Sequence, residues 1–135
     1  MHRLIRHAIL AGAVAFIALS GSACGSTATA PDPVTETLNG ILLPTASSWH
    51  VFSTSSNGEV TITLVSLSPL GNATVGVGLG VAANNSCNLQ YTTELFRVGA
   101  VWTTTLGNKG SYCVAIYDTG QISQNVNYQL KITHP

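Results

Sequence analysis

Three carboxylates in the body of the chain could carry acid–base chemistry: Glu59, Glu94 and Asp118. Cleavage of a glycosidic bond needs two carboxyl groups that face each other across that bond. Glu59 directly follows the turn sequence Asn57-Gly58, and Asp118 begins another turn, so both have an ordinary explanation in loop formation. We therefore expect no catalytic residue and no enzyme activity, and we keep a small hydrolase that uses these carboxylates as the alternative.

Histidines and metal ligands are equally sparse. Beyond the N-terminal segment the chain has only His50, beside Trp49, and His134, next to the C-terminus. A nucleophilic triad needs a histidine held between a nucleophile and an acid, and a histidine on a strand is more often a structural residue. No cysteine is close to either histidine in sequence, and the few acidic residues are scattered. The sequence predicts neither a metal site nor a cofactor.

The stretch TVGVGLGV (74–81) has a glycine at every second position, namely Gly76, Gly78 and Gly80. A dinucleotide-binding loop would place its glycines between a strand and a helix. Here no helical pattern follows, and AANNSC (82–87) is typical of a turn. The pattern therefore predicts a strand with a bare face. We expect a large side chain from a neighbouring strand, such as Trp102 or Tyr91, to pack on it, with a shallow exposed groove as the alternative.

The N-terminus has the order of a bacterial export signal: basic MHRLIRH, an apolar run over 8–19, then SGSAC. This order predicts a signal peptide over residues 1–23. The apolar run is shorter than the roughly 20 residues that a membrane-spanning helix needs. Residues 21–24 resemble the cleavage box of bacterial lipoproteins, in which Cys24 receives the lipid, although Gly21 stands where an aliphatic residue is usual. Ordinary cleavage after Ala23 is the alternative.

The cysteine count favours lipidation of Cys24. The chain has three cysteines, an odd number for an exported protein. A lipid on Cys24 leaves Cys87 and Cys113 to form a disulfide. Residues 24–35 are rich in Gly, Ser, Thr, Ala and Pro, which predicts a flexible tether. We therefore expect an exported protein of the bacterial cell envelope, bound to the membrane through its N-terminal lipid; secretion without an anchor is the alternative.

The charge distribution excludes one class of partner. Charged residues make up 7% of the chain, and Arg3 and Arg6 belong to the predicted signal peptide. The remaining cations are Arg97, Lys109 and Lys131, which form no basic stripe in the sequence. Nucleic-acid binding needs clustered Lys and Arg to neutralise the phosphate backbone. We expect no nucleic-acid partner.

From residue 36 onward the apolar residues alternate with polar ones, and turn residues separate the runs. Alternation with a period of two predicts strands, and short strands between regularly spaced turns predict an all-β sandwich or barrel over residues 36–135. The runs are SWHVF, GEVTITLVSL, TVGVGLGV, AVWTTTL, SYCVAIYD and NVNYQLKIT.

The body of the chain resembles a known family in four stretches: LNGILLPTASSWHVFSTSSNGEVTITL, VGVGLG, KGSYCVAIYDTG and YQLKITHP. Together they resemble the bacterial pre-peptidase C-terminal (PPC) type of β-sandwich, over about residues 36–134. The resemblance implies an antiparallel jelly-roll-like sandwich of about eight strands. It also implies a non-catalytic accessory module, which in some members binds polysaccharide, protein fibres or calcium. This chain has no acidic cluster that matches the calcium-binding members.

Aromatic side chains are the best candidates for ligand contact. Trp49, Trp102, Tyr91 and Tyr117 could form a platform on which sugars stack, although aromatic residues also fill sandwich cores. Alternation places Tyr112 and Tyr117 on opposite faces of one strand, so one should be in the core and the other exposed. The sequence as a whole predicts an envelope-anchored, non-catalytic binding or structural module that recognises a polysaccharide or a protein partner.

Overall fold

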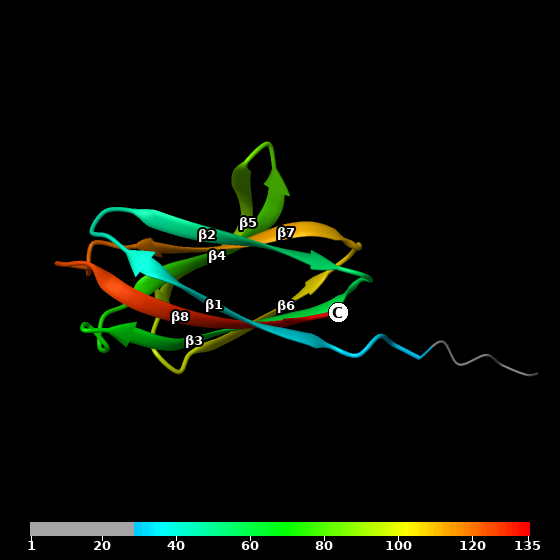
Figure 1. The fold of residues 1–135 in the computed structure, drawn as a ribbon, viewed down its shortest axis with the longest axis horizontal. Coiled ribbons are helices and arrows are strands. Elements are labelled where there is room, and N and C mark those ends of the chain that lie inside the picture. The colour runs from blue at the N-terminus through cyan, green and yellow to red at the C-terminus, as the bar shows by residue number, and fades with distance from the viewer. Residues whose placement is uncertain (1–28) are drawn as a thin grey trace, which may run out of the picture.

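The computed structural model describes residues 29–135, which form eight strands in two layers (Figure 1). The strands are β1 (Val34–Leu42), β2 (Ser47–Thr54), β3 (Gly58–Ser68), β4 (Val75–Ala83), β5 (Ser86–Phe96), β6 (Val101–Leu106), β7 (Gly110–Asp118) and β8 (Val126–His134). The predicted signal peptide, Cys24 and the first part of the tether lie outside the described residues. Residues 29–33 are exposed and lead into β1, which begins two residues before the expected start of the domain. Within the described part of the chain, no helix is long and apolar enough to cross a membrane.

The two sheets have the strand order of a jelly roll. The first sheet is β1-β8-β3-β6 and the second sheet is β2-β7-β4-β5. The antiparallel pairs β1–β8, β2–β7, β3–β6 and β4–β5 are those of one long hairpin whose tip is the β4–β5 turn. Rolling that hairpin into two layers buries one face of each sheet. The predicted fold class, an antiparallel jelly-roll-like sandwich of eight strands, is confirmed.

The core lies between the sheets and follows the alternation of the sequence. On β3, Val60, Ile62 and Leu64 are fully buried, while Thr61 and Thr63 point outward. Removing such an aliphatic side chain from water stabilises the fold by about 1.5–3 kcal/mol. The remaining fully buried core side chains are Leu42, Val75, Val77, Leu79, Val114, Ile116, Val126, Tyr128, Leu130 and Ile132.

Two strands, β1 and β5, were absent from the runs identified in the sequence, and β5 is the one that shapes the outer face. β5 has the sequence SCNLQYTTELF, and along it only Phe96 is buried. Because β5 lies at the edge of the second sheet and bends away from the core, neither of its faces needs a regular apolar pattern. Its strand character therefore comes from pairing with β4 rather than from its own sequence.

A polar contact joins the two sheets near the edge formed by β1 and β2. Tyr128 of β8 is buried, and its hydroxyl lies 2.7 Å from Ser48 Oγ and 2.8 Å from His50 Nε2, both on β2. Burial raises the pKa of Tyr128 and lowers the pKa of His50, so both groups are neutral near pH 7. Gly40 leaves room for the tyrosine ring, because a Cβ there would overlap it. His50 is thus a structural residue of the sandwich.

Replacement of Tyr128 by Phe should lower the free energy of unfolding by about 1–3 kcal/mol, because Ser48 and His50 would each lose a buried partner. Urea unfolding followed by circular dichroism measures the change. Tyr91→Phe on the exposed part of β5 is the matched control and should be neutral. Equal stability of the Tyr128 and Tyr91 variants would show that the contact contributes nothing.

Candidate binding groove

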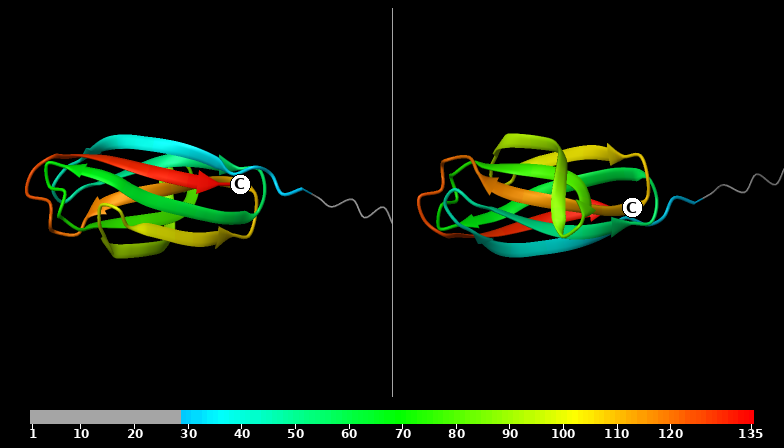
Figure 2. Two further views of the ribbon diagram at one scale, coloured as in Figure 1. Left: turned by 90° about the horizontal axis from the view of Figure 1, so that it is seen from below. Right: turned by 90° about the horizontal axis from the view of Figure 1, so that it is seen from above.

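The β4–β5 hairpin leaves the plane of the second sheet and projects over its outer face (Figures 1 and 2). Asn84 and Asn85 form its turn with φ angles of 51° and 55°, the left-handed conformation that two-residue hairpin turns require. The pairing of β4 with β5 shifts register twice, between Val75 and Val77 and between Leu79 and Gly80. Such bulges bend a strand pair and increase its twist.

The predicted disulfide between Cys87 and Cys113 is confirmed, and it holds the hairpin in this position. Cys87 is on β5 and Cys113 is on β7, with β4 between them. In a flat sheet, two strands separated by a third lie about 9.5 Å apart. The two cysteine Cα atoms are only 5.7 Å apart. The first part of β5 must therefore fold over β4, toward the outer face of β7.

The glycines of β4 make this close approach possible. A Cβ on Gly80 would overlap the backbone carbonyl of Asn88, and one on Gly78 would come within 2.8 Å of the Leu89 side chain. A Cβ on Gly76 would overlap the ring of Tyr117. The prediction that the glycine face is packed is therefore confirmed.

The expected packing partners of the glycine face were wrong. Trp102 belongs to the other sheet, where it packs against the core, and Tyr91 lies further along β5. The bend of β5 brings Asn88 and Leu89 over the glycines instead. The curvature of the hairpin decides which side chains arrive there.

A groove of about 620 Å³ lies between the hairpin and the outer face of β2 and β7. We call it the hairpin groove, and it has the size of a small-molecule site. Its lining residues come from three separate segments of the chain: Ser47, Trp49, Asn85, Ser86, Cys87, Leu89, Thr92, Glu94, Ala115 and Tyr117. A smaller hollow of about 220 Å³ shares Trp49, Asn85 and Ser86 with it, so Trp49 lies at the junction of the two.

Two of the four predicted aromatic residues meet in the hairpin groove. Trp49, which is 36% exposed, pairs with Ala115 across β2 and β7, and Tyr117 follows two residues later. Side chains in this diagonal relation are about 7–8 Å apart. Ala115 is small, and the ring of Tyr117 lies over Gly76 on the neighbouring strand β4. The opposite orientation of Tyr112 and Tyr117 is confirmed, because Tyr112 packs on the core.

The other two predicted aromatics do not line the groove. Tyr91 is 50% exposed on β5, outside the groove lining. Trp102 packs against the core cluster from β6 and is partly buried there. The sequence could not separate these residues from Trp49 and Tyr117, because each lies in a strand whose faces are distinguished only by the final packing.

The three candidate carboxylates are dispersed. Glu94 lines the hairpin groove, whereas Glu59 lies on the exposed face of β3 in the first sheet. Asp118 is engaged by the backbone: its Oδ2 accepts from the Thr45 N–H at 2.8 Å, and its Oδ1 accepts at 2.8–3.0 Å from the N–H groups of residues 120, 121 and 122. Burial alone would raise the pKa of Asp118, but these four hydrogen bonds together hold it below its usual value. Asp118 orders a loop, and no two of the three carboxylates share the groove.

The second histidine is also structural. His134 is 3% exposed, its Nε2 lies 2.8 Å from Glu36 Oε1, and its ring contacts Phe52 at a centroid distance of 5.0 Å. Across residues 29–135, no group of three or more His, Cys, Asp or Glu side chains is arranged to hold a metal ion.

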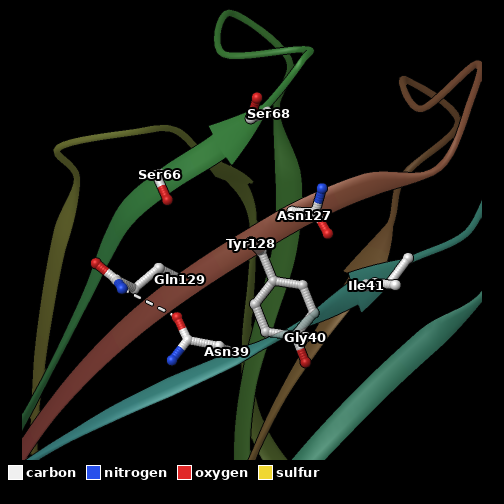
Figure 3. A pocket seen from close by; sticks show the side chains of 8 residues that line it. All are labelled: Asn39, Gly40, Ile41, Ser66, Ser68, Asn127, Tyr128 and Gln129. Carbon is white, nitrogen blue, oxygen red and sulfur yellow. Dashed lines mark hydrogen bonds between the residues drawn. The ribbon is translucent and has the colours of Figure 1, made fainter.

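The outer face of the first sheet carries a third hollow, of about 390 Å³ (Figure 3). Its rim is polar, and Gln129 Nε2 donates to Asn39 Oδ1 at 2.9 Å across it. The aromatic residue beneath it, Tyr128, is buried and bonded toward the second sheet. This hollow therefore offers amide and hydroxyl groups but no aromatic face, which makes the hairpin groove the stronger candidate site.

Sequence reasoning did not identify the polar and aliphatic walls of the hairpin groove, namely Ser47, Asn85, Ser86, Leu89 and Thr92. Two signals in the sequence pointed toward this region. The glycine stripe indicated a close approach on β4, and the cysteine pair indicated a link from the following segment to β7. Neither signal gives the path of the segment after Asn85, which depends on the tertiary structure.

Comparison with known proteins supports the fold alone. No family model matches the sequence, and no curated protein matches it significantly. The structure is similar to the crystal structure of a Yersinia pseudotuberculosis-derived mitogen, with 16% sequence identity and a TM-score of 0.55, covering 77% of this chain and 88% of that chain. The resemblance to the PPC sandwich remains a prediction.

Proposed function

We propose that this protein is an exported, non-catalytic module that binds a polysaccharide in the hairpin groove. The observation that carries the proposal is the meeting of Trp49 and Tyr117 on one outer face, beneath a wall formed by the hairpin. Sugar rings present apolar C–H faces and polar edges. Aromatic faces with a few hydroxyl and amide groups around them match that surface.

The surroundings of the groove agree with a rigid binding surface. The floor is formed by paired strands, and the wall is tied to β7 through Cys87 and Cys113. A site whose backbone is already fixed loses little entropy when a ligand binds. Ser47, Thr92 and Asn85 supply neutral donors and acceptors at its rim.

A non-catalytic role agrees with the dispersal of Glu59, Glu94 and Asp118. The structural neighbour carries the name of a mitogen rather than of an enzyme, which is consistent with this role. Export agrees with the disulfide, since such bonds persist in oxidising compartments. We further propose that a lipid on Cys24 holds the module at the membrane of the cell envelope, with residues 25–33 as the tether.

Trp49→Ala should weaken polysaccharide binding about thirtyfold, because an aromatic side chain that the ligand covers contributes about 2 kcal/mol to the binding free energy. The purified exported protein is tested against a panel of cell-wall polysaccharides by affinity electrophoresis, followed by isothermal titration calorimetry. Trp102→Phe is the matched control, since Trp102 packs against the core of the sandwich, and it should bind normally.

Two results would contradict this proposal. Unchanged binding by the Trp49 variant would show that the sugar lies elsewhere, for example in the polar hollow of Figure 3. Failure of the wild-type protein to bind any member of the panel would favour a protein partner instead.

A further inference from the structure

The charge of the hairpin groove points to a more specific ligand. Among the described residues, Glu94 is the one charged side chain that lines the groove. The cations of the described chain are Arg97, Lys109 and Lys131, and none of them lines it. A ligand in the groove is therefore exposed to one negative charge that no lining cation balances.

The two aromatic rings add to this preference. The face of an indole or phenol ring has a negative quadrupole potential and attracts a cation placed above it. Trp49 and Tyr117 lie diagonally across β2 and β7 on the same groove that Glu94 lines. A protonated amine attached to a sugar ring can contact an aromatic face while the carboxylate compensates its charge.

The neutral groups of the groove add hydrogen-bonding partners and leave its net negative charge unchanged. Asn85, Ser86 and Thr92 come from the same hairpin as Glu94 and can hydrogen-bond sugar hydroxyls. No group of the lining would favour a sugar carboxylate or sulfate, and Glu94 would repel either of them.

From these features we propose that the hairpin groove selects an amine-bearing polysaccharide, one whose amino sugars are not acetylated, over its N-acetylated and acidic counterparts. This inference rests on the proposed polysaccharide-binding function and names its ligand class. Glu94 supplies the selectivity, while Trp49 and Tyr117 supply the stacking surface.

The test uses three oligosaccharide probes with the exported protein: a β-1,4-glucosamine hexamer, the fully N-acetylated hexamer and an oligogalacturonate. At a pH where the sugar amines are protonated, titration calorimetry should show about tenfold tighter binding of the glucosamine hexamer than of the acetylated one. The oligogalacturonate should bind most weakly. Added salt should reduce the difference between the glucosamine and acetylated probes, because it screens charge.

Glu94→Gln should reduce that tenfold preference to about twofold or less, because only the faces of Trp49 and Tyr117 then remain to attract the amine. Glu59→Gln, which removes the same charge from the opposite sheet, is the matched control and should keep the preference. Equal binding of the two hexamers by the wild type, or a preference that Glu94→Gln leaves undiminished, would overturn the amine selectivity while leaving sugar binding intact. Absence of binding to all three probes and to the polysaccharide panel would overturn the proposed function together with this inference.

Discussion

Loss of the Cys87–Cys113 disulfide is expected to lower the free energy of unfolding by about 3.5 kcal/mol. The bond joins residues 26 positions apart, and a loop of that length restricts the unfolded chain by about this amount. A small domain has a total stability of only about 5–15 kcal/mol, so the loss is large. The Cys87→Ala/Cys113→Ala double variant avoids burying a hydroxyl at position 113, which is fully buried. Urea unfolding of the variant and of the wild type measures the difference.

The same double variant should also show which strands the disulfide stabilises. Because the bond holds β5 over β4, hydrogen exchange should rise in β5 and in the turn at Asn84, while β3 and β8 keep their protection. The wild type treated with reductant should behave like the variant, and the variant should not respond to reductant. An unfolding midpoint that is identical with and without the bond would contradict this account.

Gly80→Ala is expected to cost about 2–3 kcal/mol, because the added methyl group would overlap the Asn88 carbonyl. That obstacle is backbone, so no side-chain rotation can relieve it. The disulfide prevents β5 from moving away, because Cys87 directly precedes Asn88 and is bonded to Cys113 on β7. Urea unfolding again measures the cost. Gly107→Ala is the matched control, because a Cβ at that position meets no atom within 4 Å.

The two predictions are coupled in a way that tests the path of β5 directly. Once the disulfide is removed, β5 can lift from β4, so Gly80→Ala should cost less in the Cys87→Ala/Cys113→Ala background than in the wild type. A double-mutant cycle measures this difference. Strictly additive effects would mean that the disulfide does not hold β5 against Gly80.

A good part of this fold could be predicted from the sequence. Alternation in GEVTITLVSL and NVNYQLKIT identifies the buried faces of β3 and β8, because side chains along a strand point to opposite faces whatever the strand pairs with. The same local rule separates Tyr112 from Tyr117 on β7. Cysteine parity identifies the bond between Cys87 and Cys113, because an exported chain seldom leaves a thiol free.

For the candidate site, the sequence identified individual residues but not which of them lie together. Trp49 and Tyr117 were identified among four aromatic residues, and Glu94 among three carboxylates, but nothing local separates them from Trp102 or Glu59. Which of these residues share a groove depends on strands that are far apart in the chain. The register of β2 against β7 places Trp49 and Tyr117 in a diagonal relation on the same outer face.

The sequence by itself determined an all-β body with one buried face on strands such as β3 and β8, a glycine stripe on β4 and a single disulfide. The first two follow from residue types within one segment, and the third follows from the cysteine count. Only the tertiary structure decided that β5 leaves its sheet and folds over that stripe. The reason is physical: β5 has no apolar period of its own, so its path is set by its two bulges against β4, by the space above Gly80 and by the disulfide bond to β7. The groove exists because those three constraints act together on β5.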